Sequence, residues 1–154
     1  MNLTEVLDER AISLSVDAND MRGVVEALVD LLVPTGVITD RETVITDILK
    51  REDVMSTGIG GGIAIPHAQS KGAARLAVAL GRARRDVDFN SLDGRPVGLF
   101  FLVVGPEERG GYIRVLARIS RLLYSGDLQR RLAQVRTTAE ALELVRQEEA
   151  RVTH

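Results

Sequence analysis

His67 lies at the end of a glycine-rich stretch and is the first candidate for a reactive residue in this chain. The stretch reads Thr57-Gly-Ile-Gly-Gly-Gly-Ile-Ala-Ile-Pro-His67-Ala. A neutral imidazole is both a nucleophile and a group that titrates near physiological pH, so it is suited to covalent carriage of a phosphoryl group. The glycines predict a turn whose backbone N–H groups can point at an anion. Because Pro66 lacks an N–H and tends to end strands, we expect the imidazole at a strand end.

Other interpretations of this stretch remain open on residue types alone. A lone histidine is more often a core or surface residue without chemistry. A metal site is not expected, because a catalytic zinc takes about three protein ligands, while the chain has no cysteine and its other histidine is the final residue, His154. A dinucleotide fingerprint starting at Gly58 would need glycine where Ile63 stands, and a Gly-Lys-Ser/Thr sequence is missing, so nucleotide binding is disfavoured.

Three polar residues just before the glycines are candidates for holding an anion. Arg51 could bind phosphate oxygens through its planar guanidinium, or it could be a solvated arginine favoured by the dipole at a helix end. Ser56 and Thr57 could donate their hydroxyls to the same anion, or could simply shape the turn. Spacing alone does not choose between these roles.

The elements that must position these residues alternate between strands and helices. Alternating or continuous apolar residues predict strands at 12–16, 76–80 and 96–104, with a loop at 86–94 between the last two. Helical spacing predicts helices at 21–33, at about 39–52 and at 113–123, and a capping sequence at 137–140 predicts a helical tail. Interleaved strands and helices favour an α/β fold, a three-layer α/β/α sandwich with a mixed central sheet.

Composition narrows the class of protein. The chain has 154 residues, which predicts a single domain over 1–154, and a net charge of −2, which gives no field for nucleic acid. Hydrophobic residues make up 45% and aromatic residues 3%, so we expect an aliphatic core. The longest strongly apolar run, 97–104, is too short to cross a bilayer, and the acidic start does not fit a signal peptide. Together with the missing cysteine, this favours a cytoplasmic protein without direct membrane insertion.

The run from Arg51 to Ala68 resembles a specific signature, that of IIA domains of the fructose–mannitol type in the bacterial phosphoenolpyruvate-dependent phosphotransferase system, including the nitrogen-regulatory IIA proteins. The likeness covers an acidic residue, a fixed gap, the pair Ile59-Gly60 and then Ile63-Ala-Ile-Pro-His67. It extends to 87–97 and to the helix that begins near Tyr112.

The resemblance implies a phosphotransferase with a phosphohistidine intermediate and no cofactor. His67 would accept phosphate on its ε nitrogen from the histidine-containing phosphocarrier protein, with Arg51 stabilising the phosphoryl group. A sugar-permease IIB domain or regulated target proteins would follow as partners. Without membrane spans or a fused transport domain, the nitrogen-regulatory type is favoured; a sugar-specific IIA component and a regulatory binding module with impaired transfer are the alternatives.

Two positions depart from the family pattern. The family usually has asparagine where this chain has Gly61, and a second histidine where it has Tyr112. A tyrosine hydroxyl can donate to a phosphoryl oxygen but cannot supply a cation. We therefore expect His67 to be able to accept a phosphoryl group. The rate of transfer or the stability of the phosphohistidine is the property that these two changes would affect.

Overall fold

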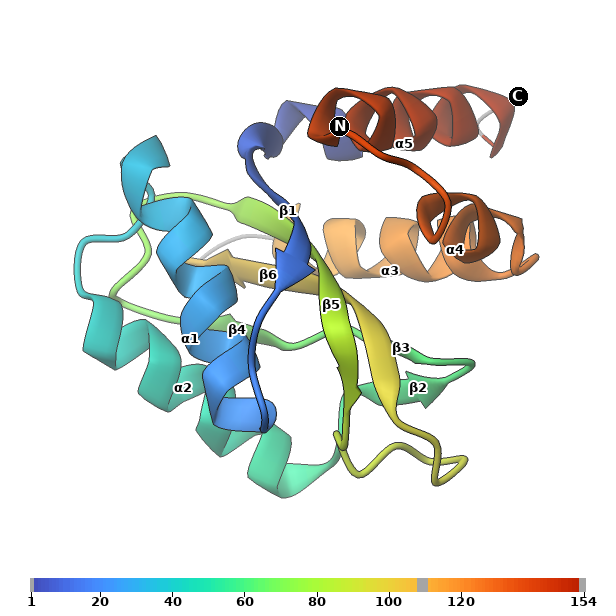
Figure 1. Ribbon diagram of the computed structural model, residues 1–154. Coiled ribbons are helices and arrows are strands. Elements are labelled where there is room, and N and C mark those ends of the chain that lie inside the picture. Colours follow the sequence, from blue (N-terminus) through green and yellow to red (C-terminus); the bar gives the residue numbers. More distant parts are fainter. Residues whose placement is uncertain (1, 108–110, 153–154) are drawn as a thin grey trace.

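A computed structural model describes residues 2–107 and 111–152, so His154 lies outside the described residues. These residues form a six-stranded mixed sheet in the order β1-β5-β6-β3-β2, with β4 also paired to β6. Helices cover both faces (Figure 1), which confirms the predicted α/β/α sandwich. The strands are β1 Leu7–Val16, β2 Gly58–Gly60, β3 Ile63–Ala64, β4 His67–Gln69, β5 Ala77–Val87 and β6 Val97–Gly105.

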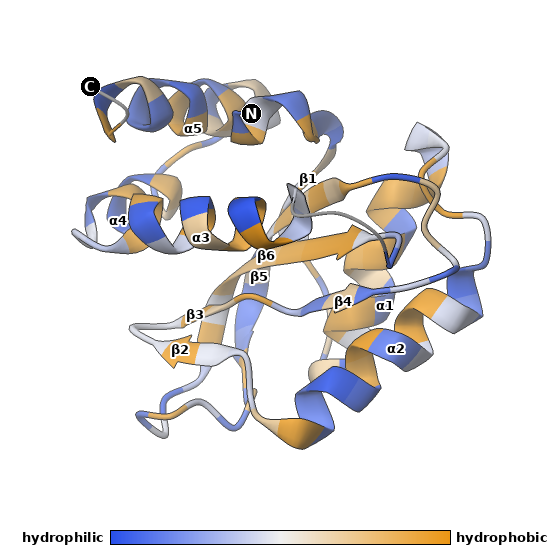
Figure 2. Ribbon diagram, turned by 180° about the vertical axis from the view of Figure 1, so that it is seen from behind, coloured by the Kyte–Doolittle hydropathy of each residue, from blue (hydrophilic) through white to orange (hydrophobic). Residues whose placement is uncertain are grey.

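Strand β6 is the centre of the sheet and matches its predicted bounds closely. It runs antiparallel to β5 and parallel to β3 and β4. Its consecutive aromatic residues Phe100 and Phe101 are both fully buried, and they belong to the cores on opposite sides of the sheet. In Figure 2 this strand is hydrophobic along nearly its whole length.

Strand β5, which neighbours β6, and strand β1, which pairs with β5, both extend beyond their predicted ranges. β1 begins at Leu7 rather than Ile12, and β5 continues to Val87 rather than ending at Leu80. The added segments are rich in exposed charged residues, so the apolar alternation used to predict strands is missing there. The part of the predicted loop up to Val87 is therefore strand.

Helices α1 (Met21–Leu32) and α2 (Arg41–Val54) cover one face, within two residues of their predicted bounds. Each begins after an aspartate that caps it: Asp20 accepts from Gly23 N–H and Asp40 accepts from Thr43 N–H. Their buried aliphatic side chains pack against Phe100 and the rest of that face of the sheet. The C-terminal end of α2 leads directly into β2.

The opposite face carries α3 (Gly111–Leu123), α4 (Asp127–Leu132) and α5 (Thr138–Val152). The helices at α3 and α5 were predicted, and Thr137 caps α5 by accepting from Glu140 N–H. The short α4 was not predicted. Among the described residues no helix combines the length and apolar character that a bilayer crossing requires.

A carboxylate on α5 joins the two ends of the described chain. Glu149, 3% exposed, accepts the backbone N–H of Leu3 at 2.5 Å and that of Thr4 at 3.2 Å. These two donors lie in a short 3-10 helix, Leu3–Glu5, that precedes β1. The N-terminal turn is thereby attached to the last helix, as Figure 1 shows.

Candidate functional site

His67 is the first residue of β4, where it pairs with Val103 of β6. β3 ends at Ala64, and Pro66 lies between the two short strands. The carbonyl of Pro66 accepts from Val103 N–H at 2.9 Å, so the backbone just before His67 is anchored to the central strand. The imidazole therefore lies at a strand end as predicted, although the histidine opens β4 rather than closing β3.

The imidazole of His67 is held by one backbone contact. Its Nδ1 lies 2.6 Å from the carbonyl oxygen of Ile65, and since a carbonyl only accepts, Nδ1 carries the proton. Nε2 then keeps its lone pair. Burial lowers the pKa of His67 and the charge of Arg51 lowers it further, while the bond to Ile65 opposes both. The half-buried ring is thus kept in its neutral, nucleophilic form.

Arg51 lies in the last turn of α2, close to this imidazole. Its Nη1 donates to the carbonyl of Met55 at 3.0 Å, which fixes the side chain along the turn that follows the helix. Its positive charge acts on the pKa of both His67 and Tyr112. The structure therefore brings together three predicted residues that come from α2, β4 and α3.

Tyr112, the second residue of α3, packs beside the histidine. The two ring centroids are 6.1 Å apart with the planes tilted by 48°. Burial raises the pKa of the Tyr112 phenol to about 12, against the opposing charge of Arg51. The hydroxyl is consequently neutral at physiological pH and can act as a hydrogen-bond donor.

The two hydroxyls predicted near the anion have acceptors inside the protein. Ser56 Oγ donates to the carbonyl of Phe89 at 2.5 Å. Thr57 is buried, and its hydroxyl and backbone N–H both donate to the Glu52 carboxylate. In this structure both side chains hold the turn between α2 and β2.

Glu52 was not singled out from the sequence, although it lies in the run from Arg51 to Ala68 that carries the family resemblance. It is 6% exposed, and burial raises its pKa to about 7 against the effects of the Thr57 amide and of Arg51. The signal was therefore present in the sequence. Its meaning depends on a contact across a turn, which spacing does not reveal.

The glycine run forms a β-hairpin turn instead of the expected anion cradle. Gly60, Gly61 and Gly62 have φ values of 97°, 66° and 80°, a backbone region that favours glycine. The Gly61 N–H donates to Asp93 at 3.0 Å, so this amide is already bonded. The turn lies at the far end of the hairpin from β4 (Figure 2). The glycines therefore allow the backbone to adopt the positive φ angles of the turn.

Exposed apolar side chains occur close to the turn that carries Arg51. Val54 and Met55 follow Arg51 at the end of α2, and Ile59 lies on β2. Leu92 is brought beside β2 because its N–H donates to the carbonyl of Gly58. We call Val54, Met55, Ile59 and Leu92 the apolar patch. A patch of this kind is typical of a surface that contacts another protein.

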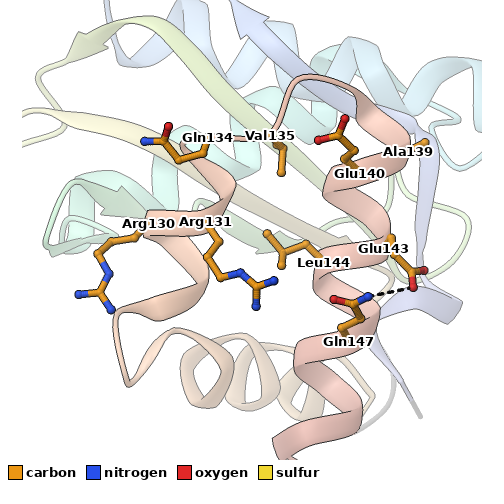
Figure 3. Close-up of a pocket in the computed structure, with 9 residues that line it drawn as sticks. All are labelled: Arg130, Arg131, Gln134, Val135, Ala139, Glu140, Glu143, Leu144 and Gln147. Atoms are coloured by element: carbon orange, nitrogen blue, oxygen red, sulfur yellow. Dashed lines mark hydrogen bonds between the residues drawn. The ribbon is translucent and has the colours of Figure 1, made fainter.

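A hollow of the described surface lies away from these residues. It is an open groove of about 800 Å³ between α4 and α5, with Arg130 and Arg131 on one side and Glu143 on the other (Figure 3). None of the site residues lines it. No group of three or more potential ligands that could hold a metal ion is found within residues 2–107 and 111–152.

Comparison with known proteins gives a match over nearly the whole chain. Residues 5–148 match the family model described as phosphoenolpyruvate-dependent sugar phosphotransferase system, EIIA 2. The chain is 33% identical over 148 residues to the fructose-specific EIIABC component of Bacillus subtilis, covering 96% of this chain but only 23% of that relative. It is also 33% identical over 135 residues to the nitrogen regulatory protein of Bradyrhizobium diazoefficiens, covering 86% of each.

A solved structure agrees with these relatives. The nitrogen regulatory protein IIA-Ntr of Neisseria meningitidis superimposes with a TM-score of 0.81 at 28% identity, over 92% of this chain and 97% of that one. The fold and the sequence comparisons therefore point to the same family.

Proposed function

Because this chain belongs to the EIIA 2 family of the phosphoenolpyruvate-dependent sugar phosphotransferase system, we propose that it carries a phosphoryl group on His67. The observation that carries the proposal is the 2.6 Å contact between Nδ1 and the Ile65 carbonyl. This contact supports a proton on Nδ1, and the proposal takes Nε2 as the acceptor nitrogen. The donor in this proposal is the histidine-containing phosphocarrier protein.

The transfer is an in-line displacement between two imidazoles. Nε2 of His67 attacks the phosphorus, the new N–P bond forms as the bond to the donor ring breaks, and the electron pair of that bond returns to the donor nitrogen. The Nδ1 proton stays on His67, hydrogen-bonded to Ile65. The contribution of the protein is position and positive potential.

Two side chains would stabilise the charge of the transferred group. The guanidinium of Arg51 can offer two N–H groups to phosphoryl oxygens. Tyr112, whose ring lies against His67, can donate its hydroxyl to a third oxygen. Ser56 and Thr57 support the site through the turn between α2 and β2 rather than by direct donation in this conformation.

The apolar patch supports docking of a partner protein next to Arg51. The half-buried imidazole keeps part of its surface accessible, so it can be reached by the phosphocarrier, and afterwards by a IIB domain or a regulated target. We favour the nitrogen-regulatory type, because both a sequence relative and a solved structure carry that description. The fructose-specific relative keeps a sugar-specific role as the alternative.

A regulatory binding module with impaired transfer is the second candidate function. Tyr112 motivates it, since a neutral phenol stands where a second histidine is usual. In that case the phosphocarrier would label His67 slowly or incompletely. Tyr112→His should then speed labelling, whereas an efficient carrier would gain little from this change.

The deciding experiment follows the mass of the protein. The chain is incubated with phosphoenolpyruvate, the first enzyme of the system and the phosphocarrier, and we expect an acid-labile gain of one phosphate. His67→Ala should abolish the gain, and His154→Ala, the matched control, should keep it. An unlabelled wild-type chain, or equal labelling of His67→Ala, would contradict the proposal. Transfer from the labelled chain to a fructose-type IIB domain would support the sugar-specific alternative.

A further inference from the structure

Glu52 is a buried carboxylate whose hydrogen bonds lead toward the imidazole. Thr57 N–H lies 3.1 and 3.3 Å from the two carboxylate oxygens, and the Thr57 hydroxyl donates to one of them. Glu52 is on the last turn of α2 and Thr57 is the residue just before β2. This contact therefore closes the turn between the helix and the sheet.

Two further bonds continue from Thr57 to His67. The Thr57 carbonyl accepts from Ile65 N–H at 3.0 Å. The Ile65 carbonyl in turn accepts the Nδ1 proton of His67 at 2.6 Å. Three successive hydrogen-bonded steps thus connect the Glu52 carboxylate with the ring that would carry the phosphoryl group.

Arg51 depends on the same turn. Its guanidinium donates to the carbonyl of Met55, which lies between Glu52 and Thr57 in the chain. A change in the position of Thr57 would consequently move the acceptor that holds Arg51 as well as the strand that holds His67. The Glu52 carboxylate, by fixing Thr57, therefore affects the positions of both Arg51 and His67.

We infer that Glu52 is a positioning residue for phosphoryl transfer, because it fixes Thr57 and, through Ile65, holds the His67 imidazole in the Nδ1–H tautomer. The inference rests on the proposed function for its kinetic consequence, but its geometric consequence can be measured on the unphosphorylated protein. Glu52 itself is not placed in contact with the imidazole or with the phosphoryl group. It acts through the Thr57 and Ile65 backbone.

A carboxylate suits this place for a chemical reason. Thr57 presents two donors, its N–H and its hydroxyl, and a carboxylate presents two acceptor oxygens. A glutamine has one acceptor oxygen and an NH₂ group, so at a pH above about 7, where Glu52 is ionised, one of the two contacts must change in Glu52→Gln. Thr57→Val removes only the hydroxyl and keeps the backbone donor and the shape.

The first test reads the tautomer of His67 by ¹⁵N NMR of the imidazole. In the wild type we expect Nδ1 protonated and Nε2 bare. In Glu52→Gln and Thr57→Val the Nε2–H tautomer should become visible, because the Ile65 carbonyl is less firmly placed. Unchanged tautomer populations in both variants would overturn the inference, whether or not the protein is phosphorylated.

The second test measures transfer from the phosphorylated phosphocarrier as a function of its concentration. The maximal rate should fall by roughly 10-fold in Glu52→Gln, the lower end of the effect that hydrogen-bonded positioning partners have on activity. The concentration giving half-maximal rate should stay within about twofold, because the surface that meets the partner is unchanged. If the wild type is labelled and Glu52→Gln and Thr57→Val both reach the wild-type maximal rate, the inference is also overturned. A wild type that is not labelled counts against the proposed function.

Glu148→Gln is the matched control. Glu148 is 4% exposed, comparable to Glu52, but it lies on α5 and is paired with Arg151. This variant is expected to lose stability without altering the His67 tautomer or the transfer rate. A tautomer shift of equal size in Glu148→Gln would show that any buried glutamate has this effect, and would overturn the assignment to Glu52.

Discussion

At the scale of single residues, the two ring nitrogens of His67 have different tasks. Nδ1 is bonded to a carbonyl only two residues earlier in the chain, so the chain itself sets the tautomer. Burial and Arg51 both lower the pKa of the ring, which keeps it unprotonated at neutral pH. A protonated imidazole has no lone pair to attack with, so the lowered pKa would extend the pH range of the proposed transfer toward acid values.

Arg51 should act both on the phosphoryl group and on the titration of His67. We expect Arg51→Ala to slow labelling of His67 by roughly 10-fold or more, since a guanidinium that stabilises phosphoryl charge has large effects. The same change should raise the pKa of His67, because a neighbouring cation disfavours the imidazolium. Quench-flow labelling and an NMR titration measure the two effects.

Lys50→Ala is the control for this prediction. Lys50 is the exposed basic residue next to Arg51 on α2, so its loss removes a nearby positive charge without touching the site. It should leave the labelling rate and the pKa of His67 close to wild type. If Arg51→Ala behaved like Lys50→Ala, Arg51 would be a solvated helix-end arginine and no part of the site.

At the scale of elements, the turn from α2 to β2 should make stability depend on pH. The pKa of Glu52 is about 7 in the folded state against an ordinary value of 4.5, so the folded protein binds this proton more tightly than the unfolded chain does. The stabilisation that comes from this proton is fully present below the ordinary pKa of 4.5. It is lost as the pH rises through the folded-state pKa of about 7. Relative to Glu52→Gln, the wild type should lose up to about 3 kcal/mol of unfolding free energy over this window.

Urea unfolding of both proteins at several pH values between 4.5 and 7.5 measures this difference. Comparing the two proteins removes the contributions of the other titrating groups, because they are common to both. A difference in unfolding free energy that stayed constant across the window would contradict the raised pKa.

The hairpin between β2 and β3 should be sensitive to side chains at Gly61. Its φ of 66° is left-handed, and a Cβ built there meets no atom within 4 Å, so the cost of Gly61→Ala is conformational. We expect a loss of roughly 1–2 kcal/mol in unfolding free energy. Gly61→Asn should lose less, because asparagine adopts this conformation more readily. Equal losses in thermal unfolding of the two variants would contradict the backbone explanation.

The sequence predicts those elements whose signals are local. Asp20 and Asp40 cap their helices, and the spacing of apolar residues after each cap determines the buried face. The positions of α1 and α2 could therefore be predicted from the sequence. The start of β1 and the end of β5 could not, because charged residues such as Arg85 remain exposed along the strand. The strands around the glycines are too short to show any periodicity.

The candidate site divides in the same way. His67 and Arg51 stand out by type and by their place in the signature, and Tyr112 follows from the family pattern. Their proximity, by contrast, depends on three elements meeting in space. The hydrogen bond from Thr57 to Glu52 could not be predicted. A hydroxyl that binds an anion and a hydroxyl that stabilises a turn occur in the same kind of sequence.

At the scale of the whole molecule, one strand joins two cores. Phe100 packs on the α1 and α2 side and Phe101 on the side of α3 and α5, and both are fully buried. Phe100→Ala and Phe101→Ala should each lose about 3–5 kcal/mol of unfolding free energy. Because β6 belongs to both cores, fluorescence and circular dichroism should report one coincident urea transition in each variant. Separate transitions would mean that the two layers unfold independently.

The hydrogen bonds between Glu149 and the N-terminal turn have a consequence for the order of folding. Leu3 and Glu149 are 146 positions apart, whereas Glu52 bonds a residue 5 positions away and His67 a residue 2 positions away. Closing a long loop costs more chain entropy than closing a short one, so contacts distant in sequence tend to form late. We expect the segment around His67 to reach its geometry early, while a nascent chain must extend through α5 before Glu149 can bond Leu3.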